Sequence, residues 1–323
     1  MNLKERLAER LQAGISLTER PYRDIFGEAD EAGCDEATVL RLTGEMIGDG
    51  LIRSFGAFAD FERLGYGGFL CGLAVPEDRI DEVAALLSAR REVTHAYLRA
   101  HEANLWYTAL VKDAEKERFT DLPRLCRCPF VVLTTRSRLK LSPTFRFSDS
   151  SEVPPDAGDE ISFEEYVPAK EDIALLALLQ ARFPLVPRPF DEAARKMGTT
   201  EGALLERLRA LRRTGVLRRV GASLDHRRVG YGANALVAWD AEDALAAGKS
   251  AARFPWVSHC YLREVRLNTL PFRWPYGLYT MLHARSREAL AGRIQEMESA
   301  LAPRSFVILP TVRELKKTRY LLP

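Results

Sequence analysis

The stretch Val93-Thr-His-Ala-Tyr-Leu-Arg99 returns as Val257-Ser-His-Cys-Tyr-Leu-Arg263, and this recurrence decides the fold. Matching blocks flank it: Gly50–Ala57 returns as Gly215–Ala222, and Phe130-Val-Val-Leu133 returns as Phe306-Val-Ile-Leu309. The offset between partners changes from 164 to 176 residues along the chain, so insertions and deletions lie between the blocks. A period this long is not that of a solenoid. It indicates a duplicated unit of about 150 residues.

Composition agrees with a folded chain of several domains. The 323 residues are 46% hydrophobic and 28% charged, which excludes a mainly disordered, collagen-like or coiled-coil protein. Lysine and arginine number 47 against 45 aspartates and glutamates, for a net charge of +2. The overall charge therefore does not indicate a nucleic-acid partner.

The cysteines and the N-terminus predict a cytoplasmic protein with no membrane partner. No apolar run approaches the roughly 18 residues of a membrane span, and the first residues alternate charge and leucine, unlike a signal peptide. Five cysteines are scattered without a C-x-x-C pair, at Cys34, Cys71, Cys126, Cys128 and Cys260. We expect reduced thiols and no protein-bound metal.

The segment between the two copies predicts a tether. Ser148–Glu165 contains seven acidic residues, no basic ones and the pair Pro154-Pro155. It cannot bury enough apolar area to order itself, and we assign a linker to 148–168. Such a tether would join an ancestral two-chain assembly, so the halves are expected to pair with each other, with a homodimer of the whole chain as a further option.

The start of each copy predicts a winged helix-turn-helix. In the second copy, apolar spacing predicts helices over 171–183, 190–197 and 203–213, and Gly215 ends the third. Strand-like runs at 216–222 and around 231–239 would form the two-stranded wing. We place these domains at 1–62 and 169–227.

The rest of each copy alternates strand and helix. The first copy predicts strands over 66–75, 93–99, 104–111 and 128–135, with helices over 78–88 and 114–125. This βαββαβ order is that of a ferredoxin-like domain, which we place at 63–147 and 228–323, with an insertion at 268–274 in the second copy. The predicted fold class is α+β, in two tandem repeats.

These motifs resemble a known family. Residues 93–108, 257–263 and 274–281, together with Phe183-Pro-Leu-Val-Pro-Arg-Pro-Phe190, closely resemble motifs of the siroheme decarboxylases, relatives of the Lrp/AsnC regulators. The resemblance implies a carboxy-lyase that removes two acetate carboxylates from siroheme and releases didecarboxysiroheme, in heme d1 biosynthesis or an alternative heme pathway. It also implies paired subunits, here fused. No added cofactor is required, because the siroheme iron enters with the substrate.

The repeated motif supplies the candidate catalytic residues. Side chains alternate along a strand, so His95, Tyr97 and Arg99 share one face. His101 keeps that face if the strand continues, whereas a turn would break the alternation; the second copy has Val265 there. A lone strand histidine is more often structural, but repetition of the motif favours catalysis. The candidate proton donors are His95, His101, His259, Tyr97 and Tyr261.

The substrate implied by the resemblance is a flat iron macrocycle with eight carboxylates. Arginines bind carboxylates through paired donors, so Arg99 and Arg263 are expected to hold the non-reacting arms. An imidazole commonly ligates heme iron, and His101 or His259 is the candidate. The candidate aromatic walls are Trp106, Tyr107, Trp274, Tyr276 and Tyr279.

The rival function is transcription regulation, with or without heme sensing. Basic residues concentrate on the third helix and wing of the second copy, at Arg207, Arg209, Arg212, Arg213, Arg218 and Arg219. The corresponding stretch of the first copy, 35–49, has four acidic residues and one arginine. A twofold DNA reader needs two competent helices, so we expect no specific DNA binding.

Overall fold

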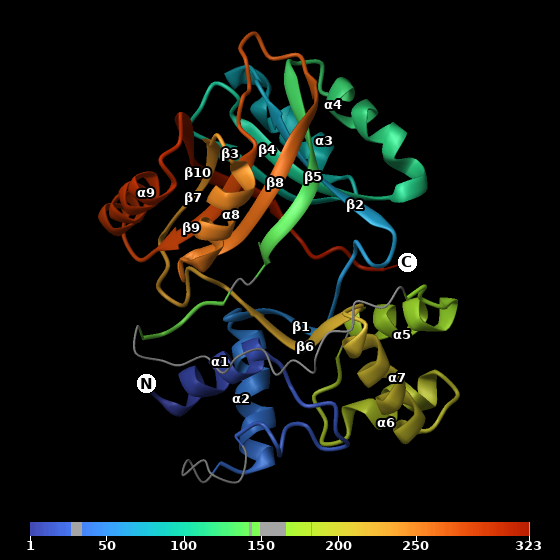
Figure 1. The fold of residues 1–323 in the computed structure, drawn as a ribbon. Coiled ribbons are helices and arrows are strands. Elements are labelled where there is room, and N and C mark those ends of the chain that lie inside the picture. The colour runs from blue at the N-terminus through green and yellow to red at the C-terminus, as the bar shows by residue number, and fades with distance from the viewer. Residues whose placement is uncertain (27–33, 142–143, 149–165, 182, 323) are drawn as a thin grey trace. The chain divides into compact units, whose positions relative to one another are not determined.

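The computed structural model describes residues 1–26, 34–141, 144–148, 166–181 and 183–322 (Figure 1). Most of the predicted tether lies outside the described residues. The chain forms two compact units, and each takes segments from both repeats. Unit 1 contains 1–64, 144–230 and 321–323, whereas unit 2 contains 65–143 and 231–320. No helix in the described part of the chain is long and apolar enough to cross a bilayer.

Unit 1 combines the helix-turn-helix segments of both repeats. The first repeat contributes α1 (Leu3–Ala13), α2 (Glu36–Gly48) and β1 (Ile52–Ala59). The second contributes α5 (Lys170–Ala181), α6 (Pro189–Lys196), α7 (Glu201–Arg213) and β6 (Leu217–Leu224), so its three predicted helices and first strand are confirmed. Thr200 and Asp35 cap α7 and α2 through side-chain oxygens, as helix N-termini require.

The predicted two-stranded wing is wrong. β6 pairs with β1 of the other repeat, with Gly56 opposite Gly221, and the strand at 233–240 belongs to unit 2. Sequence periodicity marks a strand but does not choose its partner, and here each strand finds its partner in the other copy.

The first helix of each repeat also packs against the other repeat. A Cβ at Gly56 would lie 2.3 Å from the carbonyl oxygen of Leu179 in α5, and a Cβ at Gly221 would lie 2.5 Å from that of Leu11 in α1. Each first helix therefore packs against the strand of the other repeat, at a distance that only glycine allows. The two helix-turn-helix segments are interlocked within unit 1.

Unit 2 confirms the βαββαβ order in both repeats. The first has β2 (Tyr66–Leu73), α3 (Ile80–Ser88), β3 (Val93–Arg99), β4 (Leu105–Lys112), α4 (Asp121–Leu125) and β5 (Phe130–Leu141). The second has β7 (Ala233–Asp240), α8 (Ala244–Arg253), β8 (Val257–Asn268), β9 (Leu278–Ala284), α9 (Arg287–Leu301) and β10 (Ser305–Lys317). The expected helix over 114–125 is mostly 3₁₀, over Asp113–Thr120, because Pro123 is tolerated only in the first turn of an α-helix.

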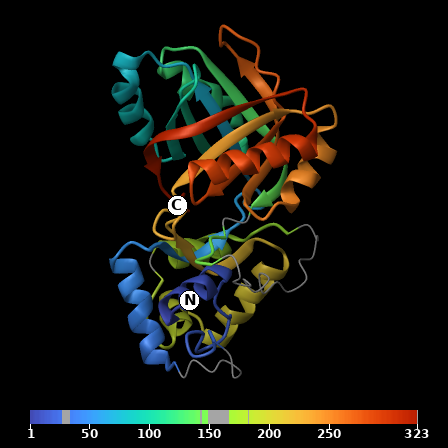
Figure 2. The same ribbon diagram turned by 90° about the vertical axis from the view of Figure 1, so that its left-hand side faces the viewer.

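The eight strands close into one barrel in the order β10-β3-β4-β2-β5-β8-β9-β7. The repeats meet twice, where β10 pairs with β3 and where β5 pairs with β8. We call the first contact junction A and the second junction B. Figures 1 and 2 show the helices of unit 2 on the outer side of the strands.

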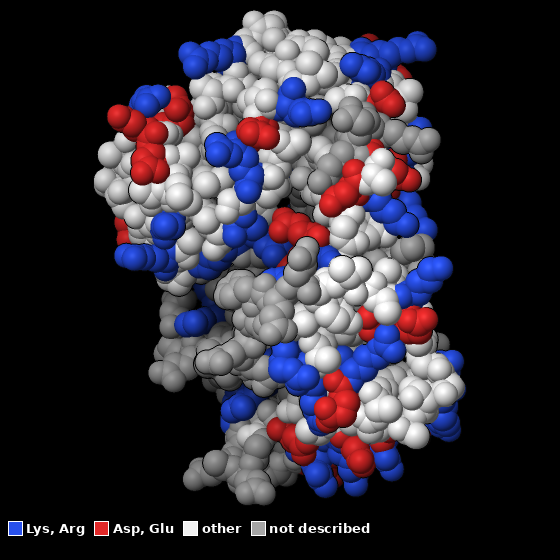
Figure 3. Space-filling model, turned by 45° about the vertical axis from the view of Figure 1, so that its right-hand side comes forward, with Lys and Arg blue, Asp and Glu red and all other residues white. Residues whose placement is uncertain are grey.

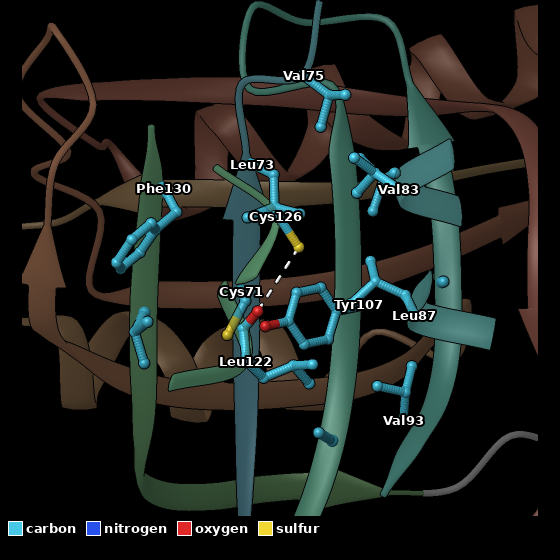
Figure 4. Packing of buried hydrophobic residues seen from close by; sticks show 14 of the residues in the cluster. Cys71, Leu73, Val75, Val83, Leu87, Val93, Tyr107, Leu122, Cys126 and Phe130 are labelled. Carbon is cyan, nitrogen blue, oxygen red and sulfur yellow. Dashed lines mark hydrogen bonds between the residues drawn. The ribbon is translucent and has the colours of Figure 1, made fainter. Parts of the chain in front are cut away.

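Alternate side chains of the barrel strands fill different cores. Cys71 and Tyr107 pack with helix residues such as Val83 and Leu122 on the outer face (Figure 4), and Val132 belongs to the same cluster. Leu70, Trp106 and Val131 instead join residues of the second repeat in a separate cluster inside the barrel. This inner core is shared by both repeats, and it establishes which face of each strand points inward.

Candidate functional site

The repeated histidine motif lies on the two strands where the repeats join. At junction A, Arg99, Tyr97 and His95 of β3 are in register with Thr311, Glu314 and Lys317 of β10. At junction B the equivalent residues of β8 are in register with β5, and the pairs are Arg263–Thr135, Tyr261–Arg138 and His259–Leu141. Each barrel junction therefore carries one copy of the same ladder of side chains.

Irregular pairing gives these ladders an unusual spacing. On β5 and β10 the facing residues are three apart, because register shifts interrupt both ladders. A β-bulge places two residues opposite one, so every third residue of the bulged strand keeps the same face. A sequence analysis that assumes every second residue of a strand lies on one face therefore misses these residues of β5 and β10.

The motif faces the inside of the barrel. Tyr97 pairs with Trp106 on β4, and Tyr261 pairs with Tyr279 on β9. Trp106 and Tyr279 belong to the inner core, and directly opposed residues of antiparallel strands share a face. Both motifs therefore point inward. Each keeps the single shared face that the alternation predicted, and their histidines and tyrosines are only half-buried.

Each strand histidine is held through Nδ1 by the residue before it. His95 Nδ1 lies 2.9 Å from Thr94 Oγ1, and His259 Nδ1 lies 2.8 Å from Ser258 Oγ. Ser258 donates its hydroxyl hydrogen to the Met281 carbonyl at 3.2 Å. Its oxygen then accepts from Nδ1–H, which makes Nε2 the lone-pair nitrogen of the neutral ring.

The arginines lie deeper than the histidines and cover the tyrosines. The Arg99 guanidinium lies 5.1 Å from the Tyr97 ring centre, and that of Arg263 lies 4.8 Å from Tyr261. Arg99 is 5% exposed, and its Nη1 donates to the Leu309 carbonyl at 2.7 Å and to Thr311 Oγ1 at 3.1 Å. Both bonds cross junction A.

Arg99 is also a buried cation that has no counter-charge among the described residues. Burial lowers the pKa of the Arg99 guanidinium to about 10, and no aspartate or glutamate pairs with it among the described residues. Its Nε is buried and makes no hydrogen bond there. A buried charge is costly unless it is paired, so this position suits an anionic group brought by a ligand.

At junction B the corresponding bond joins Arg263 to β5. Arg263 is 9% exposed, and its Nη1 donates to Thr135 Oγ1 at 3.0 Å. Thr135 and Thr311 occupy matching positions in the two repeats. Both arginines thus position the tyrosine beneath them and connect the strands on which the repeats meet.

The predicted aromatic walls divide between two faces. The ring centres of Trp106 and Trp274 lie 5.2 Å apart, and Trp274 Nε1 donates to the Tyr279 hydroxyl at 2.7 Å. Tyr276 packs edge-on against Trp274 at 5.0 Å. These rings form an inner plug, because Trp106, Trp274 and Tyr279 are at most 4% exposed. Tyr107 lies on the outer face of β4, in the core beneath the helices (Figure 4).

His101 does not continue the strand face. β3 ends at Arg99, and His101 lies in the following turn, where its Nδ1 accepts from Ala103 N–H at 3.0 Å. Its ring packs edge-on against Trp274 at 5.7 Å and Phe272 at 6.0 Å. Burial lowers the pKa of His101, partly opposed by Glu102. Of the two alternatives that the sequence leaves open, the structure has the turn, so His101 packs with the aromatic plug and not beside His95.

Of the remaining histidines, His226 packs against Phe145 in unit 1 and His283 lies buried on β9, so neither belongs to the repeated motif. In the described part of the chain no group of three or more histidine, cysteine or acidic side chains is placed to hold a metal ion. Sequence reasoning missed the partner-strand residues Thr135, Arg138, Thr311, Glu314 and Lys317. The repeat offset of 176 residues relates them, but only the bulges bring them to one face.

Comparison with known proteins agrees with this division of the chain. A family model described as an AsnC-like ligand binding domain matches residues 63–140 and 228–316. Another, described as a siroheme decarboxylase NirDL-like HTH domain, matches 4–53 and 172–218.

Named relatives match the whole chain or one half of it. The siroheme decarboxylase of Hydrogenobacter thermophilus is 31% identical, over 98% of this chain and 93% of the relative. The siroheme decarboxylase beta subunit of Desulfovibrio desulfuricans is 35% identical over 46% of this chain, which is 92% of that subunit. A crystal structure of NirDL in co-complex with an iron-uroporphyrin III analogue superposes with a TM-score of 0.70 at 27% identity, covering 99% of this chain and 94% of that chain.

Proposed function

Because the chain belongs to the siroheme decarboxylase family, we propose that it converts siroheme to didecarboxysiroheme as a carboxy-lyase. At each of two acetate arms the bond between methylene and carboxylate breaks and carbon dioxide leaves. The electron pair stays with the methylene and the conjugated ring, and one proton completes the methyl group. Heme d1 biosynthesis is the pathway we propose, since full-length relatives carry the NirDL name.

One observation carries the assignment of the site: an imidazole, a phenol and a guanidinium lie side by side on the inward face of each junction. The His95 and Tyr97 rings are 6.3 Å apart, and those of His259 and Tyr261 are 6.4 Å apart. With Nδ1 held by a hydroxyl, a protonated histidine presents its second hydrogen at Nε2, where a developing carbanion can take it. We assign proton delivery to His95 and His259, with Tyr97 and Tyr261 as the neighbouring hydroxyl donors.

The arginines are assigned to carboxylates that do not react. An arginine on the scissile carboxylate would stabilise a charge that disappears in the transition state and would slow its loss. Arg99 is supported as such an anchor by its burial without an acidic partner in the part of the chain that the structure describes. The reacting arm would then lie beside the histidine and tyrosine.

The proposed reaction is redox-neutral, so we propose that no cofactor is added. The iron belongs to the substrate. Both candidate iron ligands, His101 and His259, use Nδ1 for a hydrogen bond and would meet the iron through Nε2. Were His259 the ligand, Tyr261 would deliver the proton at junction B.

Specific DNA binding is not part of the proposal. Arg207 of α7 pairs with Asp172, Arg209 bonds the Leu17 carbonyl of the other repeat, and Arg219 stacks on Phe58 at 4.3 Å. These three of the six arginines that suggested a DNA reader therefore make contacts within unit 1. Charges of both signs are interspersed on the face shown in Figure 3. Mobility-shift assays at physiological salt should give only weak, salt-sensitive binding, and a specific nanomolar site would favour a regulator.

The half-chain length of the relatives called subunits supports pairing of the two halves, here within one chain. The cytoplasmic location expected from the sequence belongs to the same proposal. The test of the function is anaerobic incubation with siroheme followed by mass analysis. Loss of two carbon dioxide units supports it, and unchanged siroheme at enzyme excess contradicts it.

A further inference from the structure

The two junctions differ at the positions that face the tyrosines. Arg138 on β5 is in register with Tyr261, whereas Glu314 on β10 is in register with Tyr97. Arg138 and Glu314 are related by the same offset of 176 residues that relates the flanking blocks. The repeat therefore replaces a guanidinium at junction B by a carboxylate at junction A.

Both side chains share the face of the proposed site. Thr135 bonds Arg263 at one end of the junction B ladder, and the three-residue spacing continues to Arg138 and Leu141. The same spacing leads from Thr311, which bonds Arg99, to Glu314 and Lys317. All four outer positions are partly exposed, so a ligand that reaches the histidines also meets them.

The charges facing each histidine follow from these ladders. Junction B combines His259 and Tyr261 with two guanidiniums, of Arg263 and Arg138, and its three inward-facing pairs (Arg263–Thr135, Tyr261–Arg138 and His259–Leu141) include no carboxylate. Junction A combines its histidine and tyrosine with the cations of Arg99 and Lys317, but Glu314 lies between them in the ladder. A ligand rich in carboxylates gains paired donors at junction B and meets like-charge repulsion at junction A.

We propose that Arg138 is a carboxylate-anchoring residue that makes junction B the preferred binding site for the polycarboxylate macrocycle, and that Glu314 disfavours the same ligand at junction A. This inference rests on the proposed function for the identity of the ligand. It assigns unequal roles to two sites whose His-Tyr-Arg motifs are the same, and it places the difference on the partner strands.

The test measures binding without turnover, in the full-length chain. Iron uroporphyrin carries eight carboxylates and iron coproporphyrin carries four, and both are titrated by the shift of the Soret band. We expect Arg138→Glu to weaken iron uroporphyrin by about tenfold or more, with a smaller loss for iron coproporphyrin. Arg138→Lys should bind more tightly than Arg138→Glu and less tightly than the unaltered protein, because lysine keeps the positive charge but lacks the paired guanidinium donors.

Matched controls separate the site from general charge and from folding. Arg136 lies in the adjoining bulge of β5 and is exposed, so Arg136→Glu makes the same charge change and should alter affinity by less than about twofold. Glu314→Gln should strengthen iron uroporphyrin binding or add a second binding equivalent, and no change in either would remove the role assigned to Glu314. If Arg138→Glu unfolds by circular dichroism, Arg138→Gln replaces it in the same titrations.

These titrations test the binding role of Arg138 independently of whether the protein decarboxylates siroheme. Equal affinities for Arg138→Glu, Arg138→Gln and the unaltered protein, or an equal loss in Arg136→Glu, overturn the inference even if siroheme is decarboxylated. A selective loss of iron uroporphyrin binding supports it even if the siroheme assay fails, in which case only the proposed function falls.

Discussion

Unit 1 and unit 2 join the same two repeats by different means. In unit 1 the repeats exchange helices across one pair of strands, and glycines at matching positions allow the carbonyls of the other copy to approach. In unit 2 they share a closed barrel, and polar ladders lie where the copies meet. The first arrangement fixes the pairing of the halves, whereas the second brings chemistry-bearing side chains to both junctions.

The largest expected effect is loss of a proton donor from one junction of the barrel. His259→Ala and His95→Ala should each lower single-turnover decarboxylation at the affected site by about 10²–10⁴-fold. Substrate affinity should change much less, because the arginines and the aromatic plug remain. Rapid-quench mass analysis with siroheme measures the rate, and the Soret titration measures affinity. Rates within about threefold of the unaltered protein for both variants would remove the histidines from the mechanism.

A smaller loss is expected when the residue behind the histidine is changed. Thr94→Val and Ser258→Ala remove the partner of Nδ1, and loss of such a supporting hydrogen bond typically costs about 10–100-fold in activity. The pH dependence of turnover should also shift, since the imidazole tautomer is no longer fixed. Thr134→Val is the control, because its hydroxyl bonds Glu264 instead. An unchanged pH profile would assign Thr94 and Ser258 a packing role only.

Breaking the helix exchange in unit 1 should affect stability and leave the chemistry intact. Gly56→Ala places a methyl group 2.3 Å from the Leu179 carbonyl oxygen, and such overpacking costs about 1–3 kcal/mol. Thermal unfolding measures the loss. Gly292→Ala, in α9 with nothing within 4 Å, should leave the melting temperature unchanged or raise it. Equal melting temperatures for Gly56→Ala and the unaltered protein would mean that the close approach is absent in solution.

The smallest effect concerns the pH dependence of stability at His101. Burial lowers the pKa of His101 in the folded chain, so below an unfolded pKa of about 6.5 the unfolded state binds more protons. Stability linked to His101 is therefore present at neutral pH and declines as the solution is acidified. Chemical denaturation at pH 7 and pH 5.5 should show a smaller acid loss in His101→Gln. A larger acid loss in that variant would contradict the burial of the neutral ring.

Much of the architecture could be predicted from the sequence because it depends on local patterns. The repeat, the order of strands and helices, and the common face of His95, Tyr97 and Arg99 all follow from recurrence and alternation. The pairing of β1 with β6 did not, because a strand's sequence does not name its partner. Arg138 and Glu314 were missed because bulges change the spacing from two to three. The turn at His101 broke an alternation that the sequence alone left open.

The central claim is that the two inward-facing histidine motifs perform the decarboxylation. Its most direct test is the double variant His95→Ala/His259→Ala, incubated anaerobically with siroheme and analysed by mass under single-turnover conditions. We predict that siroheme still binds, as shown by its Soret shift, and that no carbon dioxide unit is lost on the timescale in which the unaltered protein removes two. Loss of both units at a rate within about threefold of the unaltered protein would contradict the claim and place the reaction elsewhere in the molecule.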